Sequence, residues 1–157
     1  MSFRILGLPA EPFADLFALS DEALKVRRAV RRIADAKPGV PCRISLTDAE
    51  PGDPVLLVHY EHQPADSPYR ASHAVYVREG EVRYDRIDEV PEMLRLRLLS
   101  VRGFDAAGML TEADVVEGRD LEGLIERLFA DPAAAYLQVH FARPGCYAAR
   151  VERAVKR

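Results

Sequence analysis

Three short segments of this chain combine reactive side chains with a backbone that proline or glycine makes irregular. They are Pro41–Arg43, His59–His73 and His140–Tyr147. Arginine offers a fork of N–H donors that fits a carboxylate or phosphate, and histidine or tyrosine adds hydrogen bonds beside it. These residue types therefore favour recognition of a small anion.

The second segment shows how such a site would be positioned. The apolar run Val55–Val58 predicts a buried strand, and its polar continuation places Tyr60 and His62 on one face. Pro64 and Pro68 then stiffen the following loop, and loops at a sheet edge commonly build sites. We predict a small-molecule site for an anionic ligand, for binding or modest catalysis, formed by Arg43, His62, Tyr69, Arg70 and His140.

The same residues also have a purely structural interpretation. Arg70 could pair with a nearby acid while the histidines stay at the surface, because structural ion pairs give the same pattern. The protein would then be a structural or interaction domain with a buried polar network or a homodimer contact. The apolar stretch Ala133–Leu137, together with exposed strands, favours a homodimer. The residues leave open whether the protein is an enzyme, and on which substrate.

Metal binding and cysteine catalysis are weaker hypotheses. A tetrahedral zinc set would draw on four weak candidates from distant parts of the chain, Cys42, His62, His140 and Cys146. They lack the short spacing of zinc modules, and no glycine-rich phosphate loop occurs, so we expect neither metal nor cofactor. A catalytic cysteine would need a base in reach, whereas free cysteines are usually small buried apolar groups.

The composition is that of an ordinary folded domain. The chain has 157 residues, 48% of them hydrophobic and 30% charged, with a formal net charge of −3. A chain of this length can bury its own core, and its charge gives no attraction for nucleic acid or anionic membranes. No apolar run approaches the ~20 residues of a membrane-spanning helix. We expect one cytoplasmic domain over residues 1–157, with reduced thiols and no nucleic-acid or membrane partner.

The expected fold is α+β, a mixed, mostly antiparallel sheet with two or three helices packed on it. Strands are expected at Phe3–Leu8, Pro54–Tyr60, His73–Arg78, Leu96–Phe104, Met109–Val116, Tyr136–Ala142 and Cys146–Ala154. Helices are expected at Glu11–Leu19, after the capping residue Ser20, at Pro91–Arg95, and from the capping residue Asp120 to Ala130.

The stretch after Ser20 supports two interpretations. In one, the helix continues along apolar residues at three- and four-residue spacing, which are Ala23, Val26, Val30 and Ile33. In the other, the helix ends early and Lys37–Gly39 forms a type II turn between hairpin strands at 30–36 and 41–46. We prefer the hairpin.

Three motifs, taken in order, resemble one bacterial protein family. They are Ala34–Gly39 leading to Pro41–Arg43, Tyr60–Gln63 with Ser67–Arg70, and His140 with Gly145–Tyr147. On these motifs the chain resembles domain-of-unknown-function family 1203 over nearly its whole length, although His59 and His73 lie outside the pattern. The resemblance implies a bacterial, single-domain protein. It brings no activity, cofactor or site residue with it.

Overall fold

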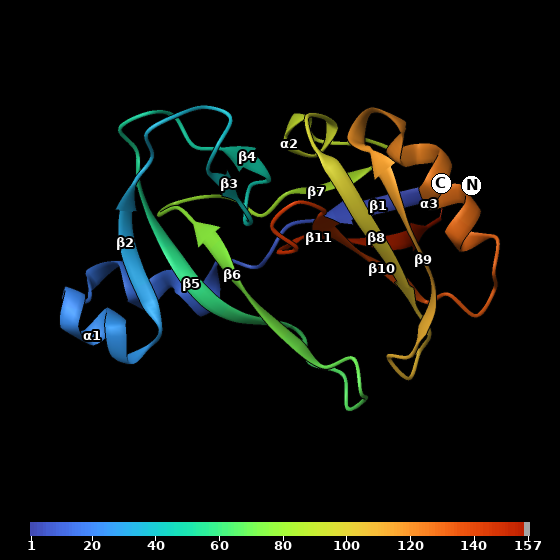
Figure 1. Ribbon diagram of the computed structural model, residues 1–157, viewed down its shortest axis with the longest axis horizontal. Helices are drawn as coiled ribbons and strands as arrows, with labels where there is room; N and C mark the ends of the chain where they lie inside the picture. The colour runs from blue at the N-terminus through green and yellow to red at the C-terminus, as the bar shows by residue number, and fades with distance from the viewer. Residues whose placement is uncertain (156–157) are drawn as a thin grey trace.

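Two β-sheets stand next to each other in the computed structural model, which describes residues 1–155 (Figure 1). One sheet has six antiparallel strands and the other has five strands of mixed direction. The expected α+β class is confirmed, with a mostly-β balance. The expectation of one sheet is wrong, because the strands divide into two hydrogen-bonded sets whose partners are distant in sequence. The pairing of the first strand with the last is one example.

The six-stranded sheet has the strand order β7-β1-β11-β10-β8-β9. Its members are β1 (Ser2–Leu6), β7 (Asp85–Ile87), β8 (Leu98–Phe104), β9 (Leu110–Glu117), β10 (Tyr136–Phe141) and β11 (Tyr147–Ala154). Because side chains alternate along a strand, Val101 and Val139 point into a core with the helices, whereas Arg102, Gln138 and His140 lie on the opposite face. That opposite face contributes to the site described below.

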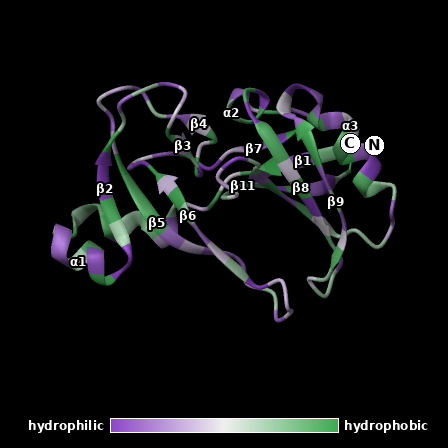
Figure 2. Ribbon diagram, viewed as in Figure 1, coloured by the Kyte–Doolittle hydropathy of each residue, from purple (hydrophilic) through white to green (hydrophobic). Residues whose placement is uncertain are grey.

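The five-stranded sheet has the order β2-β5-β6-β3-β4. Its members are β2 (Ala29–Ile33), β3 (Pro41–Cys42), β4 (Thr47–Asp48), β5 (Pro54–Gln63) and β6 (Ala71–Val77). The long strand β5 is central, as its continuous apolar run predicts, and Leu56 and Val58 are buried. Figure 2 shows hydrophobic residues along β5 and β8 and hydrophilic residues on much of α1.

The described helices are short. They are the 3-10 helix η1 (Glu11–Ala18), α1 (Asp21–Val26), α2 (Glu92–Arg95), the 3-10 turn η2 (Gly118–Asp120) and α3 (Leu121–Phe129). The predicted apolar stripe of α3 is buried, although Asp120 makes no capping hydrogen bond through its side chain. The longest described helix has nine residues, and none is long and apolar enough to cross a membrane.

The stretch after Ser20 follows neither interpretation completely. The Ser20 hydroxyl accepts a hydrogen bond from the Ala23 N–H at 3.2 Å, so α1 begins as predicted. It ends at Val26, and β2 follows, which agrees with an early helix end. However, β2 pairs with β5 rather than with the segment at 41–46, so the predicted hairpin is wrong.

Two local details of this stretch also differ from expectation. Gly39 does not have the positive φ that a type II turn requires, and the Lys37–Pro38 peptide is cis. The apolar residues at helical spacing do not form a buried stripe, because Val26, Val30 and Ile33 are all exposed. The orientation of Val30 and Ile33 is set by the pairing of β2 with β5. That pairing is a tertiary contact, so the local spacing of apolar residues does not predict it.

The segment after β1 joins the two sheets at the residue that follows β3. The Leu8 N–H donates to the Arg43 carbonyl at 2.8 Å, and the Gly7 N–H donates to the Tyr84 carbonyl at 2.9 Å. A Cβ atom at Gly7 would lie 2.0 Å from the Ile44 carbonyl oxygen. Gly7 is therefore required for this close approach.

Replacing Gly7 with alanine is expected to lower the free energy of unfolding by about 1–3 kcal/mol, because the backbone must move apart to admit a methyl group. Gly123 is the matched control, since it is exposed in α3 and a Cβ there meets nothing within 4 Å. Gly123→Ala should instead stabilise the protein by roughly 0.5–1 kcal/mol through helix propensity. Urea denaturation measures both variants, and equal effects would contradict the close approach.

Candidate functional site

Arg43 is buried between the two sheets, with 2% of its surface exposed. Its Nε donates to the Tyr147 carbonyl at 2.8 Å, its Nη1 to the Pro41 carbonyl at 2.5 Å, and its Nη2 to the Cys146 sulfur at 3.0 Å. The backbone holds the residue in place, since the Arg43 N–H donates to the Tyr76 carbonyl of β6. Residues from both sheets therefore fix this side chain.

No carboxylate contacts the Arg43 guanidinium within residues 1–155; its partners are two carbonyls and a thiol. Burial lowers the pKa of Arg43, and the Cys146 sulfur partly offsets that effect. The guanidinium carbon also lies 5.0 Å from the centre of the Phe141 ring, whose face attracts cations. A buried cation without an anionic partner is costly, and an anionic ligand would reduce that cost.

The Arg43 side chain lines a cavity of about 540 Å³. Four of the thirteen lining residues are charged: Arg43, Arg97, Arg143 and Glu117. Arg97 is neutralised by Asp48, with Nη–Oδ distances of 2.6 and 2.9 Å. Arg43 and the exposed Arg143 therefore leave an excess of positive charge over Glu117. The other nine lining residues, including Phe141, are uncharged.

A second hollow, of about 580 Å³, lies beside the first and shares Pro38 and Leu96 with it. Its charged lining residues are Lys37, Asp48 and Glu92. Lys37 forms an ion pair with Glu50, and Asp48 is bound by Arg97. This hollow offers no unpaired buried cation, so the cavity at Arg43 is the better candidate for an anion.

Three histidines and a tyrosine cluster between the sheets. The ring centres of His62 and His140 are 5.1 Å apart, and His73 lies 5.6 Å from His62 and 6.0 Å from His140. The Tyr147 ring stacks on His62 at 4.9 Å with an interplanar angle of 10°. The four rings come from β5, β6, β10 and β11, so both sheets are needed to form the cluster.

Hydrogen bonds orient the two buried histidines. His62 Nδ1 lies 2.8 Å from Gln138 Oε1, while Gln138 Nε2 donates to the His62 carbonyl at 2.9 Å. His140 Nδ1 lies 3.0 Å from the Gly145 carbonyl. Burial lowers the pKa of His62 and lowers the pKa of His140 to about 3. Both rings are therefore neutral at neutral pH.

The segment Gly145–Tyr147 links the histidines to the cavity. Its first residue binds His140, while Cys146 and the Tyr147 carbonyl bind Arg43. The structure thus gathers Arg43, His62 and His140, three of the five predicted ligand residues, around one short segment. Of these three residues, however, only Arg43 lines the cavity.

Tyr69 and Arg70, the other two predicted ligand residues, lie elsewhere. Arg70 is exposed and pairs with Glu61 through two contacts of 3.1 and 3.3 Å, as the structural interpretation anticipates. Its other expectation, that the histidines stay at the surface, is wrong for His62 and His140, which are buried. The Tyr69 ring packs edge-on against Phe104 with ring centres 5.9 Å apart. The five residues therefore do not share one cavity, and their roles in ligand binding stay a prediction.

The cysteines differ in their surroundings. Cys42 is fully buried, its thiol faces the Val40 carbonyl, and burial raises its pKa to about 12, so it is a neutral thiol at neutral pH. Cys146 is partly exposed and lines the cavity. Within residues 1–155 no three His, Cys, Asp or Glu side chains are placed to hold a metal ion. The four weak metal candidates therefore do not form one set of ligands.

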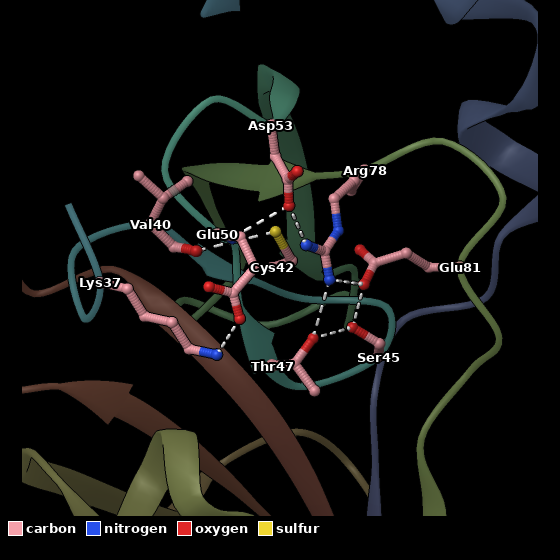
Figure 3. A network of polar contacts seen from close by, with 9 residues as sticks. All are labelled: Lys37, Val40, Cys42, Ser45, Thr47, Glu50, Asp53, Arg78 and Glu81. Carbon is pink, nitrogen blue, oxygen red and sulfur yellow. Dashed lines mark hydrogen bonds and ion pairs between the residues drawn. The ribbon is translucent and has the colours of Figure 1, made fainter. Parts of the chain in front are cut away.

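A polar network beside Cys42 supports this part of the five-stranded sheet (Figure 3). Arg78 donates to Asp53 at 2.5 Å, to Glu81 at 3.0 Å and to Thr47 at 3.1 Å. The Ser45 hydroxyl also donates to Glu81. The sequence reasoning missed this network, although Arg78 and Glu81 flank a turn at Glu79–Gly80 and could have been paired on that ground.

Sequence reasoning also missed residues of the cavity and the histidine cluster. Arg143 lies in one of the three segments singled out above, but only its neighbours were chosen. Gln138 shares a strand face with His140 by alternation, so the pattern that selected His140 could have found it. Arg97 and Arg102 carry no local signal, because Arg97 pairs with Asp48 of the other sheet and Arg102 lies opposite Gln138 of a strand distant in sequence.

Comparison with known proteins gives a family and no function. Neither the curated proteins nor the solved structures contain a match to this chain. The model of one family, described as "Protein of unknown function (DUF1203)", matches residues 39–153. That range includes Arg43, the histidine cluster and Cys146, and it confirms the resemblance seen in the sequence. The chain belongs to the DUF1203 family.

Proposed function

We propose that this protein binds a small organic anion, a carboxylate with an apolar body, in the cavity at Arg43. The observation that carries the proposal is the Arg43 guanidinium, which is 2% exposed, lines the cavity and contacts no carboxylate among the described residues. A guanidinium has five N–H donors. Arg43 uses three in the bonds described above, so two N–H groups are available to a ligand.

The walls of the cavity support an apolar body on the ligand. Leu96, Leu98, Phe141 and Pro144 all line it. Ligand cavities of roughly 300–1,000 Å³ lined by apolar groups with a few polar anchors are typical of small-molecule sites. A carboxylate at Arg43 would place the rest of such a ligand against these side chains, and the exposed Arg143 lines the same cavity.

Aryl and alkyl monocarboxylates test this proposal, with benzoate and hexanoate as the probes. Benzamide and hexanamide are matched controls, because they have nearly the same shape and no charge. We expect the carboxylates to raise the melting temperature, since a ligand that binds the native state stabilises it. The amides should have little effect. Equal shifts from an acid and its amide would mean that the Arg43 charge does not recognise the ligand.

Arg143→Ala is expected to weaken binding of the same carboxylates by about 1 kcal/mol, roughly fivefold in Kd, as removal of an exposed charge near a site commonly does. Arg32→Ala is the matched control, because Arg32 is exposed on the edge strand β2. Isothermal titration calorimetry measures both Kd values. A Kd unchanged in Arg143→Ala would place the ligand outside this cavity.

The alternative function, a structural or homodimeric interaction domain, makes a different prediction. The stretch Ala133–Leu137 offers only part of a surface for it, because Ala134 and Leu137 are buried in the chain's own core whereas Ala133 and Ala135 are exposed. A homodimer would therefore need further surface, such as the exposed edge strand β2. Sedimentation across micromolar concentrations separates the two functions, since anion binding requires no dimer.

A further inference from the structure

The two buried histidines are fixed in one tautomer. The Gly145 carbonyl can only accept a hydrogen bond, so the facing His140 Nδ1 carries the proton. The Gln138 amide nitrogen is engaged by the His62 carbonyl, so its oxygen faces His62 Nδ1, which also carries the proton. In each neutral ring the Nε2 atom is then a hydrogen-bond acceptor.

His62 Nε2 is a buried acceptor with no hydrogen-bond partner among residues 1–155. His62 itself is 7% exposed. A buried polar atom without a partner costs free energy, so an unpaired one calls for an explanation. A ligand that donates a hydrogen bond at this position would supply the missing partner.

Arg102 brings a cation to the same place. Arg102 on β8 lies opposite Gln138 on β10, and Gln138 is the residue that binds His62. Ser100, which lies opposite His140, is on the same face of β8 as Arg102. The Arg102 side chain is partly exposed and forms no hydrogen bond or ion pair with any described residue. Its charge acts on both His62 and His140. The guanidinium is therefore available to an anion.

One further ion pair lies on the same face of the six-stranded sheet, where Arg150, the partner of Gln138 on β11, donates to Glu152 at 2.8 Å. His73 is the third ring of the cluster, and it is partly exposed. Glu61 is the acid that acts on His62, but its carboxylate is held by Arg70 at the surface. The cluster therefore combines an unpaired cation with an unpaired acceptor, and no free carboxylate among the described residues competes for the cation.

We propose that the cluster of His62, His140 and Arg102 is a second binding site, specific for a protonated oxyanion such as hydrogen phosphate or the singly protonated form of a phosphate monoester. The ligand's P–O–H group donates to His62 Nε2, and its remaining oxygens accept from the Arg102 guanidinium. A side-chain rotation of the partly exposed His73 or Arg102 admits the ligand. This site is separate from the carboxylate cavity and does not depend on the function proposed for it.

Comparing inorganic phosphate with sulfate tests whether His62 Nε2 accepts a hydrogen bond from the ligand, because the two anions have the same tetrahedral shape. Near pH 7 phosphate keeps at least one O–H group, whereas sulfate has none. A site with a buried acceptor rejects an anion that cannot donate to it, by a large factor. We expect phosphate to bind at least tenfold more tightly than sulfate, in titrations followed through the histidine ring ¹⁵N resonances. The Nε2 resonance of His62 should respond most.

Arg102→Gln tests the cation, and Arg32→Gln is its matched control on the exposed strand β2. The first variant should weaken phosphate binding at least tenfold, and the second should leave it unchanged. Arg143→Ala, which alters the carboxylate cavity, should also leave phosphate binding unchanged. Equal affinity for sulfate and phosphate, no response of the His62 ring, or full binding by Arg102→Gln would each overturn the proposal.

Discussion

Replacing Arg43 with alanine is expected to lower the free energy of unfolding by about 2–4 kcal/mol. The substitution empties a large buried volume, and large-to-small changes in cores cost about 2–5 kcal/mol. It also removes the donors to the Tyr147 and Pro41 carbonyls, which adds to the loss. Removal of a buried cation without a carboxylate partner offsets part of it.

Arg43→Met separates these contributions. Methionine fills much of the same volume and carries no charge, so this variant should lose less stability than Arg43→Ala. Arg32→Ala is the exposed control and should stay within about 0.5 kcal/mol of the natural chain. Urea denaturation followed by circular dichroism gives all three values. A loss below about 1 kcal/mol for Arg43→Ala would mean that the side chain does not hold the two sheets together.

Acidification from pH 6.5 to 5 is expected to destabilise the protein through its buried histidines. In the folded state burial lowers the pKa of His140 to about 3, while its unfolded value is the ordinary 6.5. Between these values the unfolded chain binds a proton that the folded chain does not, so stability falls as the pH falls. His140 alone should cost on the order of 2 kcal/mol over this range, and His62, whose pKa is also lowered, acts in the same direction.

The matching variant is His140→Gln, which removes the titrating ring and should flatten the stability profile above pH 5. His59→Gln is the control, because His59 is exposed on β5 and outside the cluster. The measurement is the free energy of unfolding in urea at a series of pH values. The carboxyl groups whose pKa the fold lowers, such as Asp85 and Glu122, titrate at lower pH and do not obscure this window. A flat profile in the natural chain would contradict burial of neutral histidines.

Most elements of this fold were predictable from local sequence. The Ser20 cap, the apolar stripe of α3 and the hairpin of β8 and β9 are each determined by residues a few positions apart. The division of the strands into two sheets was not predictable in this way. The pairing of β1 with β11, for example, depends on which surfaces bury best together, and no local pattern records that.

In the candidate site, too, some features follow from the sequence and others only from the tertiary structure. The residue types that bring charge and acceptors to the chain, including Arg43 and His140, were recognisable in the sequence, as was the family. The sequence could not distinguish the arginine that becomes buried, Arg43, from the one that pairs at the surface, Arg70. That difference was decided by the tertiary structure, because Arg43 binds residues 103 and 104 positions away, whereas Arg70 binds an acid nine positions away. The free energy of burying a charge depends on such distant contacts, which exist only after the two sheets have come together.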